Sequence, residues 1–121
     1  MNFIFVALGG GIGAMLRYAI SLIPFSTSFP ILTLITNFLG ALMIGFIAQL
    51  AQEKSISDNI LLFLKTGVCG GFTTFSTFSL ESYSLFKDNQ TILGILYIFS
   101  SFTTCILGVF IGAHCVKLLS S

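Results

Sequence analysis

The chain has 121 residues, of which 55% are hydrophobic and 7% are charged; its formal net charge is +1 and its mean hydropathy is +1.05. A soluble domain carries about 25% charged residues, so this composition excludes a soluble globular protein and a soluble catalytic domain. The near-neutral charge also excludes the basic surface of a nucleic-acid-binding protein.

A membrane-spanning helix needs about 20 largely apolar residues, so four such helices and short loops account for nearly the whole chain. We expect an all-α integral membrane protein, not an enzyme, that forms one domain over residues 1–121. The predicted helices cover about 2–22, 31–50, 60–85 and 91–116.

The first predicted span contains a glycine-rich run, Gly9 to Ala14, that formally matches the G-x-G-x-x-A fingerprint of dinucleotide-binding folds. That match is weak, because the first acidic residue is Glu53, far beyond the roughly 20 positions at which a ribose-binding acid follows. The glycines fit better as points where a neighbouring helix approaches closely. Arg17 follows them, either extending to lipid headgroups or placing a positive charge at the mouth of an anion path.

Polar residues on the second and fourth spans lie on single helical faces. Thr33 and Asn37 are four residues apart on the second span. An amide at bilayer depth needs a partner or water, so Asn37 either joins two helices, lines a polar route or ties down an irregular segment. On the fourth span, a polar and small stripe recurs every three or four residues: Tyr97, Ser101, Cys105, Gly108 and Gly112.

The third span is organised around residues 67–79, GVCGGFTTFSTFS, which predict a break in the helix. Each of its three glycines weakens a helix by about 1 kcal/mol relative to alanine, and its Ser and Thr hydroxyls compete for backbone hydrogen bonds. Irregular backbone at membrane depth is tolerated only inside protein or beside a wet cavity. The four carboxylates, expected in loops or near span ends, suit neither covalent catalysis nor a proton-coupled pump: Glu53, Asp58, Glu81 and Asp88.

These features favour passive permeation of a small ion. Carbonyls exposed at a broken helix can replace part of a cation's hydration shell, and the positive edges of Phe75 and Phe78 can face an anion. The same two rings also suit ordinary packing, and spacing alone does not separate fluoride from chloride or from a cation. Donors for an anion come from four side chains: Asn37, Ser76, Thr77 and Ser101.

Four helices are too few to enclose a pore, so we expect a homodimer. The Lys and Arg residues are divided almost evenly between the two sides, with Lys54, Lys65 and Lys117 opposed by Arg17 and Lys87. Such a weak bias permits both orientations in the membrane, and an antiparallel pair would create inverted-repeat symmetry between chains.

Three segments of the chain, in this order, closely resemble the signatures of the Fluc (CrcB) fluoride channels: 10–18 (GGIGAMLRY), 36–40 (TNFLG) and 67–79. The likeness extends over the whole length and the four-span layout. The resemblance implies a multi-pass protein of the bacterial cell membrane that assembles as an antiparallel, dual-topology homodimer with two fluoride pathways. It further implies passive export of fluoride, which limits fluoride toxicity.

The resemblance also implies roles for individual residues. A structural Na⁺ at the dimer centre would be held by the backbone carbonyls of Gly70 and Thr73 from each subunit, and Arg17 matches the vestibule arginine. Cys105 departs from the family pattern, since a further hydroxyl is expected there. The residues that match the ion pathway are Asn37, Phe75 and Phe78, with a hydroxyl track formed by Thr33, Ser76, Thr77, Tyr97 and Ser101.

Other functions and assemblies stay open at this point. Some relatives pair two different subunits, so a second homologous subunit is an alternative to the homodimer. A small multidrug-type exporter needs a carboxylate embedded in the membrane, and the first span has none. A non-transporting membrane assembly subunit would explain the GxxxG pattern of the fourth span but not the break in the third.

Overall fold

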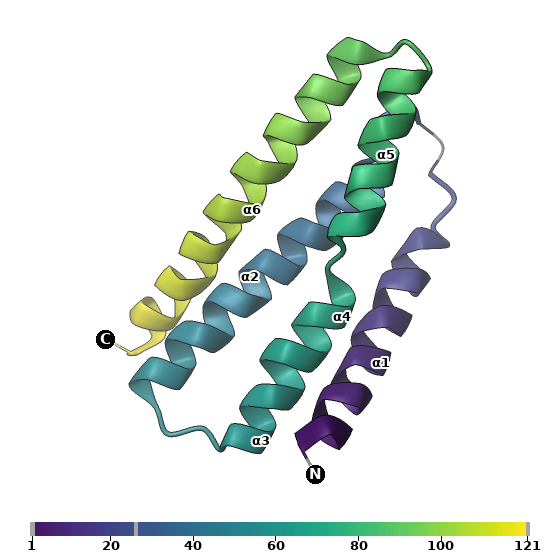
Figure 1. Cartoon of the computed structure of the whole chain (residues 1–121). Helices are drawn as coiled ribbons and strands as arrows, with labels where there is room; N and C mark the ends of the chain where they lie inside the picture. Colours follow the sequence, from purple (N-terminus) through teal and green to yellow (C-terminus); the bar gives the residue numbers. More distant parts are fainter. Residues whose placement is uncertain (1, 26, 121) are drawn as a thin grey trace.

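The computed structural model describes residues 2–25 and 27–120, and within these residues all regular structure is helical (Figure 1). The predicted all-α class is confirmed, as are the four spans, because four helices are long and apolar enough to cross a membrane. The predicted domain includes positions 1, 26 and 121, which lie outside the described residues. The elements are α1 (Asn2–Ser21), α2 (Ile31–Glu53), α3 (Asp58–Leu61), the π-helix η1 (Leu62–Cys69), α4 (Gly70–Phe72), α5 (Phe75–Lys87) and α6 (Thr91–Ser120).

The third crossing, Asp58–Lys87, is broken where the sequence predicts it. Thr73 (φ −85°, ψ 157°) and Thr74 (φ −150°, ψ 115°) have extended backbones. The Oγ1 of Thr74 accepts a hydrogen bond of 3.1 Å from the N–H of Thr77 and so caps α5, an interaction that typically stabilises a helix by about 1 kcal/mol. The chain therefore crosses as two helical pieces with an extended link between them.

The first piece is also irregular before the link. Its eight-residue segment η1, Leu62–Cys69, is π-helical, a form that is rare and occurs frequently at functional sites. A wider π-turn rotates the residues that follow it, so the direction of Gly70 and the link depends on η1.

Glycines allow α1 to contact η1 and α4 backbone against backbone. A Cβ on Gly9 would overlap the carbonyl oxygen of Phe63, and one on Gly13 would overlap that of Val68. The predicted role of this cluster in close helix packing is confirmed. Gly10 and Gly11, in contrast, have open space at their Cβ positions.

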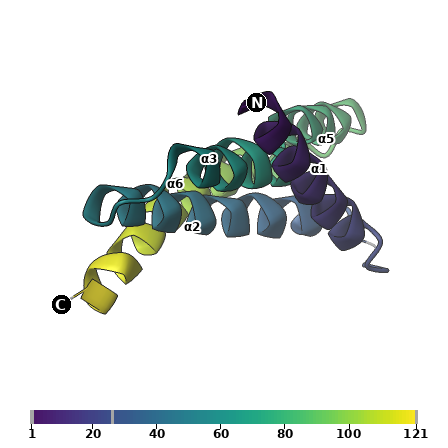
Figure 2. The same ribbon diagram turned by 90° about the horizontal axis from the view of Figure 1, so that it is seen from below.

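Close packing at glycines also joins α2 to α6, which lie side by side (Figure 1). A Cβ on Gly45 would overlap the carbonyl of Val109, and one on Gly112 would overlap that of Leu42. The GxxxG pattern of the fourth span, which by itself indicates only helix packing, packs α6 on α2. The view from below shows α1 running obliquely to α2 (Figure 2).

The turn from α5 to α6 has a specific cause. Asn89 adopts a left-handed backbone (φ 62°), and its N–H donates to Phe86 O while the Gln90 N–H donates to Leu85 O. This is the Schellman pattern, in which glycine or asparagine ends a helix by satisfying its last carbonyls. Asn89 thus sends the chain back along α2 as α6.

Most large apolar side chains face outward, as expected for a protein solvated by lipid. Phe3 is 87% exposed and Leu119 is 77% exposed. The buried hydrophobic cluster is small and consists of Phe78, Leu85 and Tyr97. Packing of backbone on backbone at glycines, more than a large apolar core, therefore holds the four helices together.

Two glycine substitutions on α1 separate packing from helix propensity. Gly13→Ala should lower the free energy of unfolding by about 1–3 kcal/mol, because the new methyl group overlaps the Val68 carbonyl. Gly11→Ala meets open space and should be neutral or stabilising by up to about 1 kcal/mol. Thermal denaturation of the purified variants in detergent measures both, and equal melting temperatures would contradict the packing role of Gly13.

Candidate functional site

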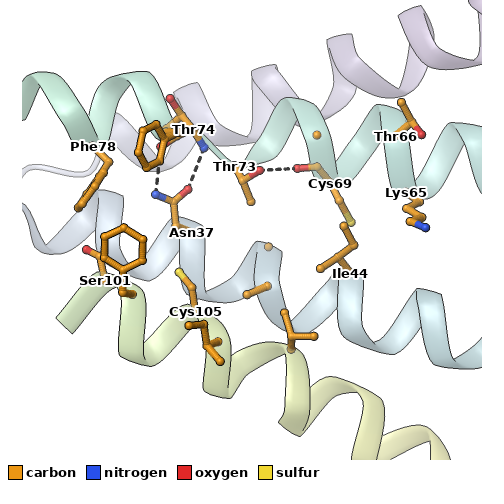
Figure 3. A pocket seen from close by; sticks show the side chains of 17 residues that line it. Asn37, Ile44, Lys65, Thr66, Cys69, Thr73, Thr74, Phe78, Ser101 and Cys105 are labelled. Atoms are coloured by element: carbon orange, nitrogen blue, oxygen red, sulfur yellow. Dashed lines mark hydrogen bonds between the residues drawn. The ribbon is translucent and has the colours of Figure 1, made fainter. Parts of the chain in front are cut away.

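An open cavity of about 620 Å³ lies beside the break in the third crossing (Figure 3). Its walls come from α2, η1, α4, the extended link, α5 and α6. Most of its lining is apolar, but six predicted site residues contribute to it. These are Asn37, the exposed Gly70, Thr73, Phe75, Phe78 and Ser101.

Asn37 holds the extended link in place. Its Nδ2 donates to the carbonyl oxygen of Thr74 (3.1 Å), and its Oδ1 accepts from the Thr74 N–H (2.8 Å) (Figure 3). Both backbone groups lie at the break, where the usual i to i−4 pairing is interrupted. Of the roles considered for Asn37, the structure therefore shows the tie to the broken segment, while its place in the cavity wall leaves a pathway role as a prediction.

The break changes the partners of the last carbonyls of α4. In a continuous helix Gly70 O would accept from the Thr74 N–H, but that N–H donates to Asn37. The N–H and hydroxyl of Thr73 both donate to Cys69 O, at 3.1 and 2.9 Å. Backbone carbonyl oxygens without a helical partner are the kind of ligand that suits Na⁺. A side-chain metal site is a different matter: the described residues contain no cluster of three His, Cys, Asp or Glu that could hold a metal ion.

Arg17 is half-buried and reaches the break from α1. Its Nε donates to the carbonyl oxygen of Gly71 (3.1 Å), which the break deprives of its next helical turn. The side chain thus stabilises the end of α4 and brings a positive charge to it. Arg17 is not among the residues that line the cavity.

The two predicted pore phenylalanines have different surroundings. Their rings are 5.4 Å apart, but Phe75 is 70% exposed and Phe78 is 7% exposed. The ring of Phe78 also contacts Tyr97 (5.1 Å) and Phe102 (5.9 Å). Phe78 is therefore part of the core of its own subunit, whereas Phe75 projects from it.

Ser101 carries an unsatisfied hydroxyl. Its Oγ is the one buried side-chain N or O atom among the described residues without a hydrogen-bond partner, and the residue is 7% exposed. A buried unpaired hydroxyl costs about 1–3 kcal/mol. Cys105 lies one helical turn further along α6 and lines the same cavity (Figure 3).

The other predicted hydroxyls form a separate group around Glu81. Thr33 Oγ1 donates to Glu81 Oε2 (3.0 Å), and the Tyr97 hydroxyl donates to Glu81 Oε1 (2.8 Å). The sequence places Glu81 near the end of its span; in the structure its half-buried carboxylate is held between α2 and α6 by two hydroxyls, contacts that the sequence did not indicate. Its position three residues after Phe78 was the overlooked signal, since i and i+3 share a helical face.

A second, more polar cavity of about 520 Å³ begins at this group. Thr33 and Glu81 line it, as do Asp88 and the loop before α2. Phe78 lines the first cavity, and its ring contacts Tyr97, whose hydroxyl donates to Glu81 in the wall of the second cavity. Ser76 and Thr77 contribute differently: both lie within hydrogen-bond distance of Thr74 Oγ1, at 3.4 and 3.0 Å, and belong to the capping of α5.

Comparison with known proteins agrees with this geometry. Residues 4–113 match the family model described as CrcB-like protein, Camphor Resistance (CrcB). Three of the similar relatives carry the name fluoride-specific ion channel FluC. They come from Roseiflexus sp. (44% identical; 98% of this chain and 99% of the relative aligned), Ruminiclostridium cellulolyticum (43%; 100% and 96%) and Clostridium perfringens strain 13 (46%; 94% and 92%).

The family model matches most of the chain, and the relatives align with it over nearly their full lengths. The break, the amide that ties it and the arginine at its edge lie within the matched residues. The chain therefore belongs to the CrcB family.

Proposed function

We propose that this chain is a passive, fluoride-selective channel of the bacterial cell membrane that exports fluoride and thereby limits its toxicity. Relatives aligned over nearly the whole chain are named fluoride-specific ion channels, and four helices suit a multi-pass membrane protein. The observation that carries the proposal is the buried, unpaired hydroxyl of Ser101. A donor without an acceptor, in the wall of a cavity, is suited to a desolvated anion.

The first cavity would dehydrate fluoride in steps. Ser101 offers its hydroxyl proton, and the edges of Phe75 and Phe78 offer the positive rim of the aromatic quadrupole. The rings also exclude a large hydrated anion. A small anion with a high charge density gains most from such donors, which is the physical basis for selecting fluoride over chloride.

Beyond Phe78, the ion would pass to the group around Glu81. Thr33 and Tyr97 now donate to the Glu81 carboxylate, and an arriving fluoride would compete for the same two protons. The carboxylate would then repel the anion towards the second cavity, which Glu81 also lines. In this mechanism Glu81 promotes release, while Ser101 and the rings promote entry.

We further propose that two copies assemble as an antiparallel homodimer with a pathway on each side. Phe75 projects from the subunit at the open cavity, and a Cβ on Gly70 would meet no atom of its own chain within 4 Å. The glycine therefore leaves room for something outside the chain. A structural Na⁺ bound by the carbonyls of Gly70 and Thr73 from both copies fits this position. A second homologous subunit is the alternative partner.

The selectivity of the channel is tested in liposomes loaded with fluoride or chloride. Valinomycin and a K⁺ gradient let K⁺ leave with the anion, so that no membrane potential builds up to stop the efflux. Fluoride should be released rapidly and chloride barely, because only the smaller ion interacts with Ser101 and the two rings strongly enough to offset the free energy of its dehydration. An ion-selective electrode measures both rates. Equal release of the two anions, or release driven only by a proton gradient as in a multidrug-type exporter, would contradict the proposal.

Ser101→Ala should change transport and stability in opposite directions. A hydrogen bond from this hydroxyl would stabilise a bound anion by about 1.5–3 kcal/mol, so its loss should lower the fluoride flux by roughly tenfold to 100-fold. The melting temperature should stay equal or rise, because an unpaired polar atom is removed. Ser82→Ala is the control: the Ser82 hydroxyl is buried but already donates to Phe78 O, so its loss should destabilise the protein and spare the flux. Normal flux in Ser101→Ala would exclude this serine from the pathway.

Dual topology is tested with single cysteines at the two ends of the molecule, Ser55→Cys and Asp88→Cys, in a chain whose three native cysteines are replaced by alanine. Ser55 lies in the α2–α3 loop and Asp88 in the α5–α6 turn, at opposite ends in Figure 1. If both orientations occur, a membrane-impermeant maleimide added to intact cells should label about half of each variant. Labelling of one variant alone would show a fixed orientation.

A further inference from the structure

Lys65 occupies an unusual place for a charged residue. It lies in η1, within the third crossing, and it is exposed. Its side chain lines the first cavity together with Thr66, at the end opposite Phe78 and Ser101 (Figure 3). The cavity therefore runs from a lysine at one end to an unpaired hydroxyl at the other.

No carboxylate accompanies this lysine in the cavity. Among the lining residues Lys65 is the only Lys, Arg, Asp or Glu. Glu81 accepts hydrogen bonds from Thr33 and Tyr97, and Glu53 accepts them from Gln49 and Ser120. Asp88 lines the second cavity, and Asp58 lies at the start of α3, about two turns before Lys65.

An ammonium group inside a membrane crossing is expensive unless water, a carboxylate or an anion accompanies it. The cavity supplies no carboxylate, so the partner must come from outside the chain. The unpaired Ser101 hydroxyl in the same cavity also requires an acceptor. Two groups of different type, on η1 and α6, thus both favour a negatively charged occupant.

We infer that Lys65 makes the outer part of this cavity a wet, positively charged antechamber that concentrates fluoride before it is dehydrated at Ser101. The inference rests on the proposed function, and it assigns to Lys65 a role in ion supply rather than in selection. A cleft with one sign of charge and apolar walls raises the local concentration of the opposite ion. Lys65 therefore sets the conductance at low fluoride without setting the preference for fluoride over chloride.

The competing partner for the ammonium group is the headgroup of an anionic lipid, reached by extending the side chain to the membrane surface. Both partners are anions, so the experiment must separate them. If Lys65 concentrates fluoride in the cavity, substituting it should still lower the fluoride current in membranes of purely zwitterionic lipid. An effect of Lys65 confined to vesicles with anionic lipid would assign the side chain to the membrane surface and overturn the inference.

The test compares fluoride currents of wild type, Lys65→Arg, Lys65→Gln and Lys65→Glu in zwitterionic planar bilayers. At an ionic strength of about 10 mM, where screening extends over roughly 30 Å, Lys65→Gln should lower the current about twofold to fivefold and Lys65→Glu more. Lys65→Arg should match wild type. At about 1 M, where the screening length is roughly 3 Å, all four should converge. Lys87→Gln, a lysine outside the cavity at the end of α5, is the matched control and should change nothing.

Two results would overturn the inference: equal currents in wild type, Lys65→Gln and Lys65→Glu at low salt, or losses that persist unchanged at high salt. A second measurement does not depend on transport. Broadening of the ¹⁹F resonance of sodium fluoride by detergent-solubilised protein should be weaker for Lys65→Gln than for wild type or Lys87→Gln. If wild type broadens the line but carries no current, the proposed channel function fails while the role of Lys65 in binding fluoride stands. If all variants broaden the line equally, the role of Lys65 fails and the proposed function is unaffected.

Discussion

The architecture depends on one constraint: a helix that breaks inside an apolar medium must find partners for the backbone groups it releases. Here those partners come from two other helices. Asn37 on α2 pairs with both the N–H and the carbonyl of Thr74, and Arg17 on α1 pairs with the carbonyl of Gly71. The link is therefore a fixed element with defined hydrogen bonds, and its open side is the wall of the cavity.

Close glycine packing makes this fixation possible. α1 can reach the break with Arg17 because Gly9 and Gly13 let it lie directly on η1 and α4, and α2 is held against α6 by Gly45 and Gly112. Lipid offers little hydrophobic drive for helices to associate, so close contact and hydrogen bonds must supply the stability. Phe75 is exposed and a Cβ on Gly70 would have open space, so the proposed second copy has room to complete the site here.

The polar residues of the subunit divide into those already paired and those still open. Thr33 and Tyr97 donate hydrogen bonds to Glu81. Ser101 and Lys65 line the first cavity, where the Ser101 hydroxyl has no hydrogen-bond partner and no carboxylate is among the lining residues. Under the proposed function, an anion would meet the open groups first and the engaged ones later. Attraction at entry and competition with a carboxylate at exit would together prevent any one site from binding the ion too tightly to conduct it.

The sequence by itself determined the membrane class, the four helices, the break at residues 67–79 and the packing role of the glycines. These are local properties, since composition, periodicity and glycine content act within a few residues. The partners of each polar side chain were decided only by the tertiary structure. Asn37 could have lined a route or joined two helices, and nothing near Glu81 in the sequence indicates Thr33 as its partner. Contacts between residues 37 and 48 positions apart depend on how the helices cross. Neither the π-turns of η1 nor the oblique path of α1 leaves a periodic signal in the sequence.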